Sequence, residues 1–336
     1  SSHREFLPAD MEEQKLFVML KLRPARAVEA TKPATAFVFL IDTSGSMYEI
    51  VDGGGQRTGK TITVDGQQYN ETIGGKTKID IVIESLLALV RSGKLDVNDK
   101  VAIVQFDDTA STLIELTSAT ETAQLEAAIN QLRNHSGGTQ MAKGMRQTLR
   151  IFANQVGMAS QRVLIFTDGV TFDEDECRNL SPDFATQNIP ITSLGVGDYN
   201  EDLLIGLSDK SGGRVFHVAD DNSGSSGAIN DLPKTITAEF ARAQQDVITN
   251  LALSAKTVKG VRLQRVIRAY PDMAEFSIES TPYPIGNAAA NDETVFIMEF
   301  NIDSRPTSRA RVAQVGLTYD VPGQNRRGEL EPQNLI

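Results

Sequence analysis

The sequence predicts an α/β protein whose central sheet is doubly wound and mostly parallel, with helices on both faces, inserted into a β-sandwich formed by the N- and C-terminal segments. Three observations predict it. Residues 37–41 form a continuous apolar run, as in a strand buried on both faces. Between residues 36 and 248, runs of this kind alternate with segments of helical period. After residue 248 only the alternation typical of strands remains.

The sandwich is expected to draw on both ends of the chain. Apolar side chains alternate over residues 16–22, which predicts a half-buried strand. The same alternation returns at 296–302 and 313–321. We therefore assign residues 1–35 and 249–336 to one β-sandwich domain.

The inserted domain, residues 36–248, is expected to alternate strands and helices. Strands are predicted at 37–41, 101–106, 111–116, 162–166, 189–196 and 215–218. Helices are predicted at 79–90, 123–132, 141–155, 201–207 and 229–248.

Composition narrows the class of partner and the compartment. The net charge of −11 argues against nucleic acid and anionic membrane, which need clustered Lys and Arg. Cys177 is the only cysteine, so no internal disulfide can form. No run of about 18 apolar residues and no signal-peptide core is found, so we expect no membrane insertion and a cytoplasmic protein. A secreted or surface location stays open if a signal peptide has been removed.

A carboxylate and two hydroxyls follow the first buried strand of the inserted domain. Asp42, Ser44 and Ser46 alternate on one tight loop, so their side chains can converge. Asp168 ends another predicted strand, and Thr139 precedes a predicted helix. In a doubly wound sheet such loops meet beyond the carboxyl ends of the strands, where the strand order reverses. Hydroxyl and carboxylate oxygens are hard ligands, which indicates a site for Mg²⁺, or for Mn²⁺ or Ca²⁺.

The order Asp42-x-Ser44-x-Ser46, then Thr139, then Asp168-Gly169 resembles the metal-ion-dependent adhesion site (MIDAS) of von Willebrand factor A (vWA) domains. The resemblance covers about residues 36–248 and implies the Rossmann-like vWA fold, in a bacterial member of the family. It also implies that the two serines and the threonine bind the metal directly. The two aspartates would act mainly through water or through hydrogen bonds to the hydroxyls.

The expected function is non-enzymatic. A dication held mainly by neutral hydroxyls and water stays electron-poor and keeps an exchangeable position. An Asp or Glu of a partner protein can complete its coordination shell. We expect no His, Lys or Cys near enough to serve as a base or a nucleophile.

The resemblance leaves the biological setting open. A scaffold or adaptor in a bacterial complex is expected, and some relatives work beside AAA+ ATPases, which makes such a system a candidate partner. The alternative among binding proteins is a secreted or surface adhesin. Relatives can also switch affinity by displacement of the last helix, here predicted at 229–248.

A second motif competes for the function. Residues Gly54–Thr61 match G-x-x-x-x-G-K-[ST], the phosphate-binding P-loop, which would indicate an NTPase. A P-loop joins a strand directly to a helix, whereas residues 62–69 here predict a hairpin around Asp65-Gly66. We instead interpret residues 51–75 as an insertion that borders the metal and influences the choice of partner. A surface loop without that role is the alternative.

Overall fold

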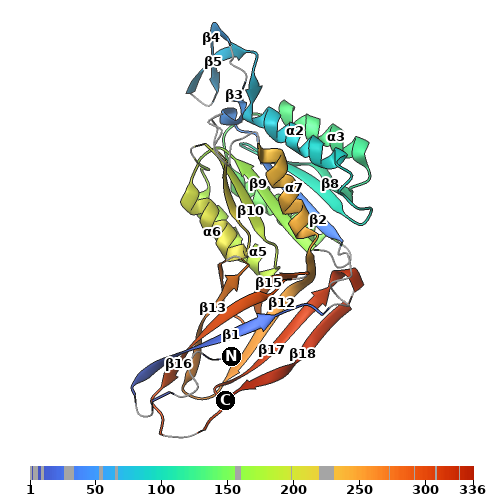
Figure 1. Ribbon diagram of the computed structural model, residues 1–336. Coiled ribbons are helices and arrows are strands. Elements are labelled where there is room, and N and C mark those ends of the chain that lie inside the picture. The colour runs from blue at the N-terminus through green and yellow to red at the C-terminus, as the bar shows by residue number, and fades with distance from the viewer. Residues whose placement is uncertain are drawn as a thin grey trace.

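The computed structural model describes residues 2, 7–8, 11–25, 34–52, 56–64, 67–155, 160–197, 199–218, 231–271, 273–290, 292–306, 309–324 and 326–336. Figure 1 shows a central layer of helices and strands, a β-sandwich at one end and a β-hairpin at the other.

The central sheet confirms the predicted fold class. Its strand order is β11-β10-β9-β2-β7-β8, and all neighbours are parallel except β7 and β8. The strands are β2 (Thr35–Asp42), β7 (Lys100–Phe106), β8 (Ala110–Ser118), β9 (Ser160–Thr167), β10 (Ile191–Val196) and β11 (Val215–Val218). Strand β2 lies between β7, which follows it in the chain, and β9, which begins the other half of the sheet. The strand order therefore reverses beside β2, where such sheets bind their ligands.

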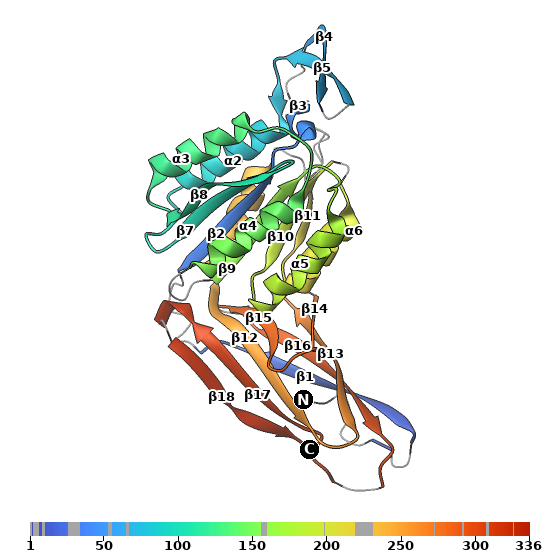
Figure 2. The ribbon, with the colours of Figure 1, turned by 180° about the vertical axis from the view of Figure 1, so that it is seen from behind.

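Helices cover both faces of this sheet, as Figures 1 and 2 show. One face packs on α2 (Lys78–Arg91), α3 (Thr122–Gln131) and α7 (Leu232–Ala243). The other packs on α4 (Met141–Ala153), α5 (Glu174–Thr186) and α6 (Glu201–Ser211).

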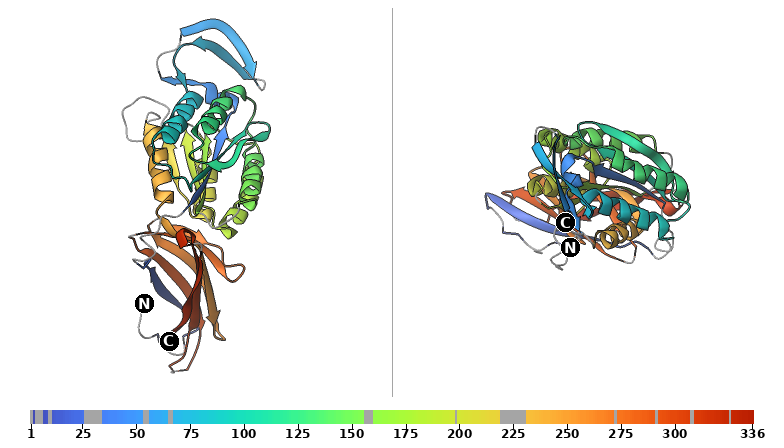
Figure 3. Two further views of the ribbon diagram at one scale, coloured as in Figure 1. Left: turned by 90° about the vertical axis from the view of Figure 1, so that its right-hand side faces the viewer. Right: turned by 90° about the horizontal axis from the view of Figure 1, so that it is seen from above.

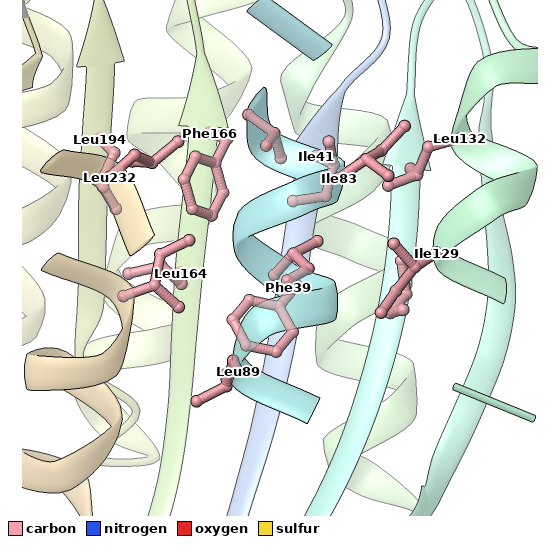
Figure 4. Packing of buried hydrophobic residues seen from close by; sticks show 14 of the residues in the cluster. Phe39, Ile41, Ile83, Leu89, Ile129, Leu132, Leu164, Phe166, Leu194 and Leu232 are labelled. Carbon is pink, nitrogen blue, oxygen red and sulfur yellow. The ribbon is translucent and has the colours of Figure 1, made fainter. Parts of the chain in front are cut away.

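The residues of β2 explain why it is the central strand. Phe39 and Ile41 point to one face, where Ile83 and Leu89 of α2 meet them (Figure 4). Val38 and Leu40 belong to the core on the other face. A strand that is apolar on both sides loses contact with water only in the middle of a covered sheet. This packing fixes where β2 ends, and Asp42 is its last residue.

The β-sandwich consists of two four-stranded sheets, ordered β1-β16-β13-β14 and β15-β12-β17-β18. The strands are β1 (Glu13–Leu22), β12 (Asp246–Thr257), β13 (Val261–Tyr270), β14 (Ala274–Phe276), β15 (Tyr283–Ala289), β16 (Thr294–Asp303), β17 (Ala313–Val321) and β18 (Arg326–Leu335). Strand β1 pairs along its whole length with β16, so the chain's first strand lies beside one of its last. Both sheets contribute side chains to one apolar core.

Polar contacts join the sandwich to the amino ends of the central strands. Asp246, which opens β12 and is 4% exposed, accepts a 2.5 Å bond from Arg162 of β9 and a 3.1 Å bond from Asn287 of β15. Arg268 of β13 donates to the carbonyl of Gly212 at 2.9 Å. The sandwich therefore lies at the amino ends of the central strands, and the carboxyl end of β2 lies at the opposite side of the domain (Figure 3).

The segment between β2 and α2 forms strands in its described parts. Short strands β3 (Ile50–Asp52) and β6 (Lys76–Thr77) pair at its base. Beyond them β4 (Gln56–Val64) and β5 (Gln67–Ile73) form the predicted hairpin, although its Asp65-Gly66 turn lies outside the described residues.

The P-loop interpretation fails on this context. Gly54 and Gly55 lie outside the described residues, but Lys60 and Thr61 lie inside strand β4. The next element is β5, not a helix, so no helix N-terminus is available there to bind a phosphate.

The last helix of the inserted domain is shorter than predicted. We expected it over 229–248, but α7 ends at Ala243, and Asp246–Ile248 already belong to β12. The apolar residues Val247 and Ile248 continue the helical pattern of the sequence by coincidence, because they face the sandwich cores. The expected domain boundary at 248/249 thus falls inside a strand.

Candidate metal site

The loop of residues 42–46, called the serine loop below, is held by hydrogen bonds on both sides. Asp42 is fully buried, and its two carboxylate oxygens accept from the Ser44 amide at 2.8 Å and from the Thr167 hydroxyl at 2.6 Å. Thr43 donates its hydroxyl to Gln105 at 2.8 Å, which ties the loop to β7. The loop is therefore fixed to both strands that flank β2.

Two hydroxyls and a second carboxylate meet at this point. The side-chain oxygens of Ser44 and Ser46 lie 3.2 Å apart. Ser46 donates to Asp168 Oδ1 at 2.7 Å, which bridges the loops after β2 and β9. The structure thus brings together four of the five predicted residues: Asp42, Ser44, Ser46 and Asp168.

The backbone positions Thr139 beside the same loop. The Gly45 amide donates to the Gly137 carbonyl at 3.0 Å, two residues before Thr139. The Thr139 carbonyl accepts from the Phe172 amide at 2.9 Å, just beyond Asp168. With 7% exposure, Thr139 lies between the serine loop and the Asp168 loop, although its hydroxyl forms no hydrogen bond to either of them in the described structure.

Lys78 corrects one expectation. We predicted no lysine near enough to serve as a base or a nucleophile, but Lys78 Nζ lies 2.8 Å from Asp168 Oδ2 and 2.7 Å from Glu49 Oε2. Burial alone would lower the pKa of this ammonium group, but the Asp168 charge and the bonds to Asp168 and Glu49 outweigh burial and raise it. These contacts favour the charged form of Lys78.

Burial dominates the electrostatics of Asp42. It raises the pKa of the Asp42 carboxyl to about 7, and the charge of Asp168 adds to the rise, while bonds from Thr167 and Ser44 oppose it. A buried carboxylate with a raised pKa is stabilised by any cation that binds nearby.

The donor set fits a hard divalent cation. Its atoms are hydroxyl and carboxylate oxygens, the ligands that Mg²⁺ and Mn²⁺ prefer. Within the described ranges no group of three or more His, Cys, Asp or Glu side chains is placed to hold a metal. A cation at this edge would therefore need the serine and threonine hydroxyls as ligands.

A family model for the von Willebrand factor type A domain matches residues 37–231, which is more than half of the chain. The chain belongs to the vWA family. The matched segment begins in β2 and includes both loops of the site, so the metal-site resemblance and the family assignment rest on the same part of the fold.

Solved structures with low sequence identity share the fold. The vWA protein from Catenulispora acidiphila is 19% identical and superposes with a TM-score of 0.71 over 98% of this chain and 70% of its own. The ArnB paralog VWA2 from Sulfolobus acidocaldarius is 17% identical, with a TM-score of 0.61 over 100% of this chain and 73% of its own. The coverage of nearly the whole chain extends the likeness to the β-sandwich.

A curated protein is similar in sequence over most of this chain. Protein sll0103 of Synechocystis sp., described as uncharacterized, is 21% identical over 258 residues, which is 74% of this chain. The chain spans 59% of the length of that relative. No helix among the described residues of this vWA protein is long and apolar enough to cross a membrane.

Sequence reasoning missed two residues that shape the vWA site. Lys78 is the first residue of α2, where a positive charge opposes the helix dipole. That unfavourable placement was the available signal that Lys78 pairs with a carboxylate. Thr167 precedes Asp168 at the end of β9 and binds Asp42 through the parallel pairing of β2 and β9; sequence spacing alone gives no signal for it.

Proposed function

We propose that this vWA protein is a non-enzymatic interaction module that binds a partner protein through a divalent cation, Mg²⁺ by donor chemistry. Ser44, Ser46 and Thr139 would hold the cation, with Asp42 and Asp168 behind them. When bound, the cation supplies an exchangeable coordination position that an Asp or Glu of the partner can fill. vWA domains are in general protein-interaction or adhesion modules, which supports a role in binding another protein.

The contact between Lys78 and Asp168 is the observation that carries the proposal furthest. The serine loop donates to two carboxylates, from the Ser44 amide to Asp42 and from the Ser46 hydroxyl to Asp168, and the ammonium neutralises the second of them. A dication at those hydroxyls would therefore keep part of its positive charge. That residual charge favours an incoming carboxylate, because an anion in a low-dielectric site binds most strongly where it neutralises a net positive charge.

The rim of the site supports a protein as the ligand. Phe172 is 78% exposed and Val170 58% exposed, although both follow Asp168 within four residues. The Phe172 ring lies over Gly138, next to Thr139. An exposed aromatic ring beside a charged centre is typical of the residues that dominate protein interfaces.

The metal requirement can be tested directly. Wild-type protein and the Asp42→Ala variant are used as bait in cell extract with Mg²⁺ or with EDTA, and captured proteins are identified by mass spectrometry. We expect a partner that is recovered only by wild type with Mg²⁺; AAA+ ATPase subunits are among the candidates. Asp202→Ala, at an exposed carboxylate in the first turn of α6, is the control and should behave as wild type. Equal recovery in all conditions would refute the proposal.

We make a separate prediction for Phe172 at the rim of the site. Phe172→Ala should weaken binding to that partner by about tenfold or more, because interface aromatics of this kind contribute about 2 kcal/mol. Mn²⁺ affinity, measured by electron paramagnetic resonance, should stay unchanged. Met273→Ala is the matched control, since Met273 is also 78% exposed but lies in the sandwich segment. Partner binding that survives Phe172→Ala unchanged would contradict a role for Phe172 in the interface.

A further inference from the structure

A pocket at the junction of the two domains carries an inference that is independent of the metal site. The pocket has a volume of about 360 Å³ and is lined from both domains. It lies at the amino ends of the central strands, because Arg162 near the start of β9 and Asp246 at the start of β12 both line it. Asp42 lies at the other, carboxyl ends of these strands.

Four arginines from separate segments of the chain line this pocket. They are Arg162 of β9, Arg214 just before β11, Arg242 in the last turn of α7 and Arg268 of β13. The carboxylates that line it are Asp246 and Asp292, so its wall carries an excess of positive charge in a chain of net charge −11. An anion is attracted to a lining that carries more positive than negative charge.

These arginines make contacts inside the protein, and one buried donor of Arg162 is left without a partner among the described residues. Arg162 is 8% exposed and gives Nη2 to Asp246, but its buried Nε has no hydrogen-bond partner among the described residues. Arg214 faces Glu239 at 3.7 Å, and the Arg268 guanidinium lies 5.7 Å from the centre of the Phe276 ring while donating to Gly212. A buried donor without a partner points to a ligand or water that completes it.

We propose that this pocket binds a small molecule with two or more phosphate or carboxylate groups. A guanidinium group is planar and can bind either a phosphate or a carboxylate through two parallel hydrogen bonds. The volume matches a small molecule and is too small for a folded partner. Since Arg242 and Arg268 belong to different domains, the ligand would bridge the vWA domain and the sandwich.

The test uses protein and buffers freed of metal by a chelating resin, so that no cation at the serine loop can capture the probe. Sodium pyrophosphate and sodium citrate are the two probes, which separate phosphate from carboxylate recognition, and sodium acetate at equal ionic strength is the reference. Calorimetry and thermal unfolding are measured on wild type, Arg214→Gln and Arg242→Gln. Both substituted arginines are only partly buried, so these variants should fold.

We expect at least one polyanion to bind and to raise the melting temperature, while acetate does neither. Either arginine substitution should weaken binding by about tenfold or more, the usual effect of losing a hydrogen bond to a charged group. Arg265→Gln removes an exposed arginine of the same strand as Arg268 and should bind as wild type. Failure of both probes to bind, or equal binding by all four proteins, would overturn the proposal.

Discussion

In metal-free buffer at pH 8, Lys78→Met should destabilise the protein by about 3 to 5 kcal/mol, the usual cost of removing one partner of a buried ion pair. The side chain of Lys78 is 5% exposed and that of Asp168 0%, so the substitution leaves a buried carboxylate without its cation, close to Asp42. Mg²⁺ should restore most of the loss, because a dication at the serine hydroxyls supplies the missing positive charge. Urea unfolding with and without Mg²⁺ measures both effects.

Lys76 offers a matched control within the same segment. Its side chain is 48% exposed and pairs with Glu84 at 2.6 Å. Lys76→Met should change stability by less than about 1 kcal/mol, with no dependence on Mg²⁺, because an exposed ion pair contributes little. A loss in Lys78→Met that Mg²⁺ does not reduce would show that the lysine acts only through packing and not as a counter-charge.

Asp42→Asn should make the metal-free protein more stable at pH 8, by an amount on the order of a few kcal/mol. In the folded protein burial raises the pKa of Asp42 to about 7, from its ordinary value of 3.8. As pH rises from about 4 to about 7, the unfolded chain loses this proton before the folded protein does, so wild-type stability falls across that window and stays low above it. Asparagine does not titrate, so the variant avoids the fall.

The same variant should lose its response to Mg²⁺, whereas wild type should gain stability from Mg²⁺ most strongly above pH 7, where Asp42 is ionised. Urea unfolding at several pH values between 4.5 and 8, without metal and with Mg²⁺, measures both halves. Asp202→Asn is the control, since this carboxylate is exposed and far from the serine loop in the chain. Parallel pH profiles for wild type and Asp42→Asn would contradict the buried-carboxylate account.

Much of the central domain could be predicted because burial leaves a clear pattern in its residues. Strand β2 is apolar on both faces, so its end and the position of Asp42 followed from the sequence. Helix α5 is missing from the predicted helices, because Pro182 and polar side chains hide its helical period. Strand β18 was missed because nearly all its side chains are exposed, which leaves no alternation to detect.

The residues of the site could be predicted from the sequence only where they lie close together on a short loop. Asp42, Ser44 and Ser46 converge because a tight turn leaves them few alternatives. Lys78 reaches Asp168 from the far side of an insertion of more than twenty residues, and no spacing rule spans such a gap. The arginine pocket likewise combines residues of β9, α7 and β13, which are far apart in the sequence and belong to two domains.

Strands β1 and β18, the first and last of the described strands, both lie in the sandwich, which adjoins the vWA sheet at the ends of its strands opposite the serine loop (Figures 1 and 3). Attachment of the chain to a surface through Ile336 would therefore turn the loops that carry Ser44, Ser46 and Phe172 away from that surface. The same geometry makes a sensor surface coupled at that residue the natural format for measuring how partners engage the metal edge, because tether and analyte approach from opposite directions.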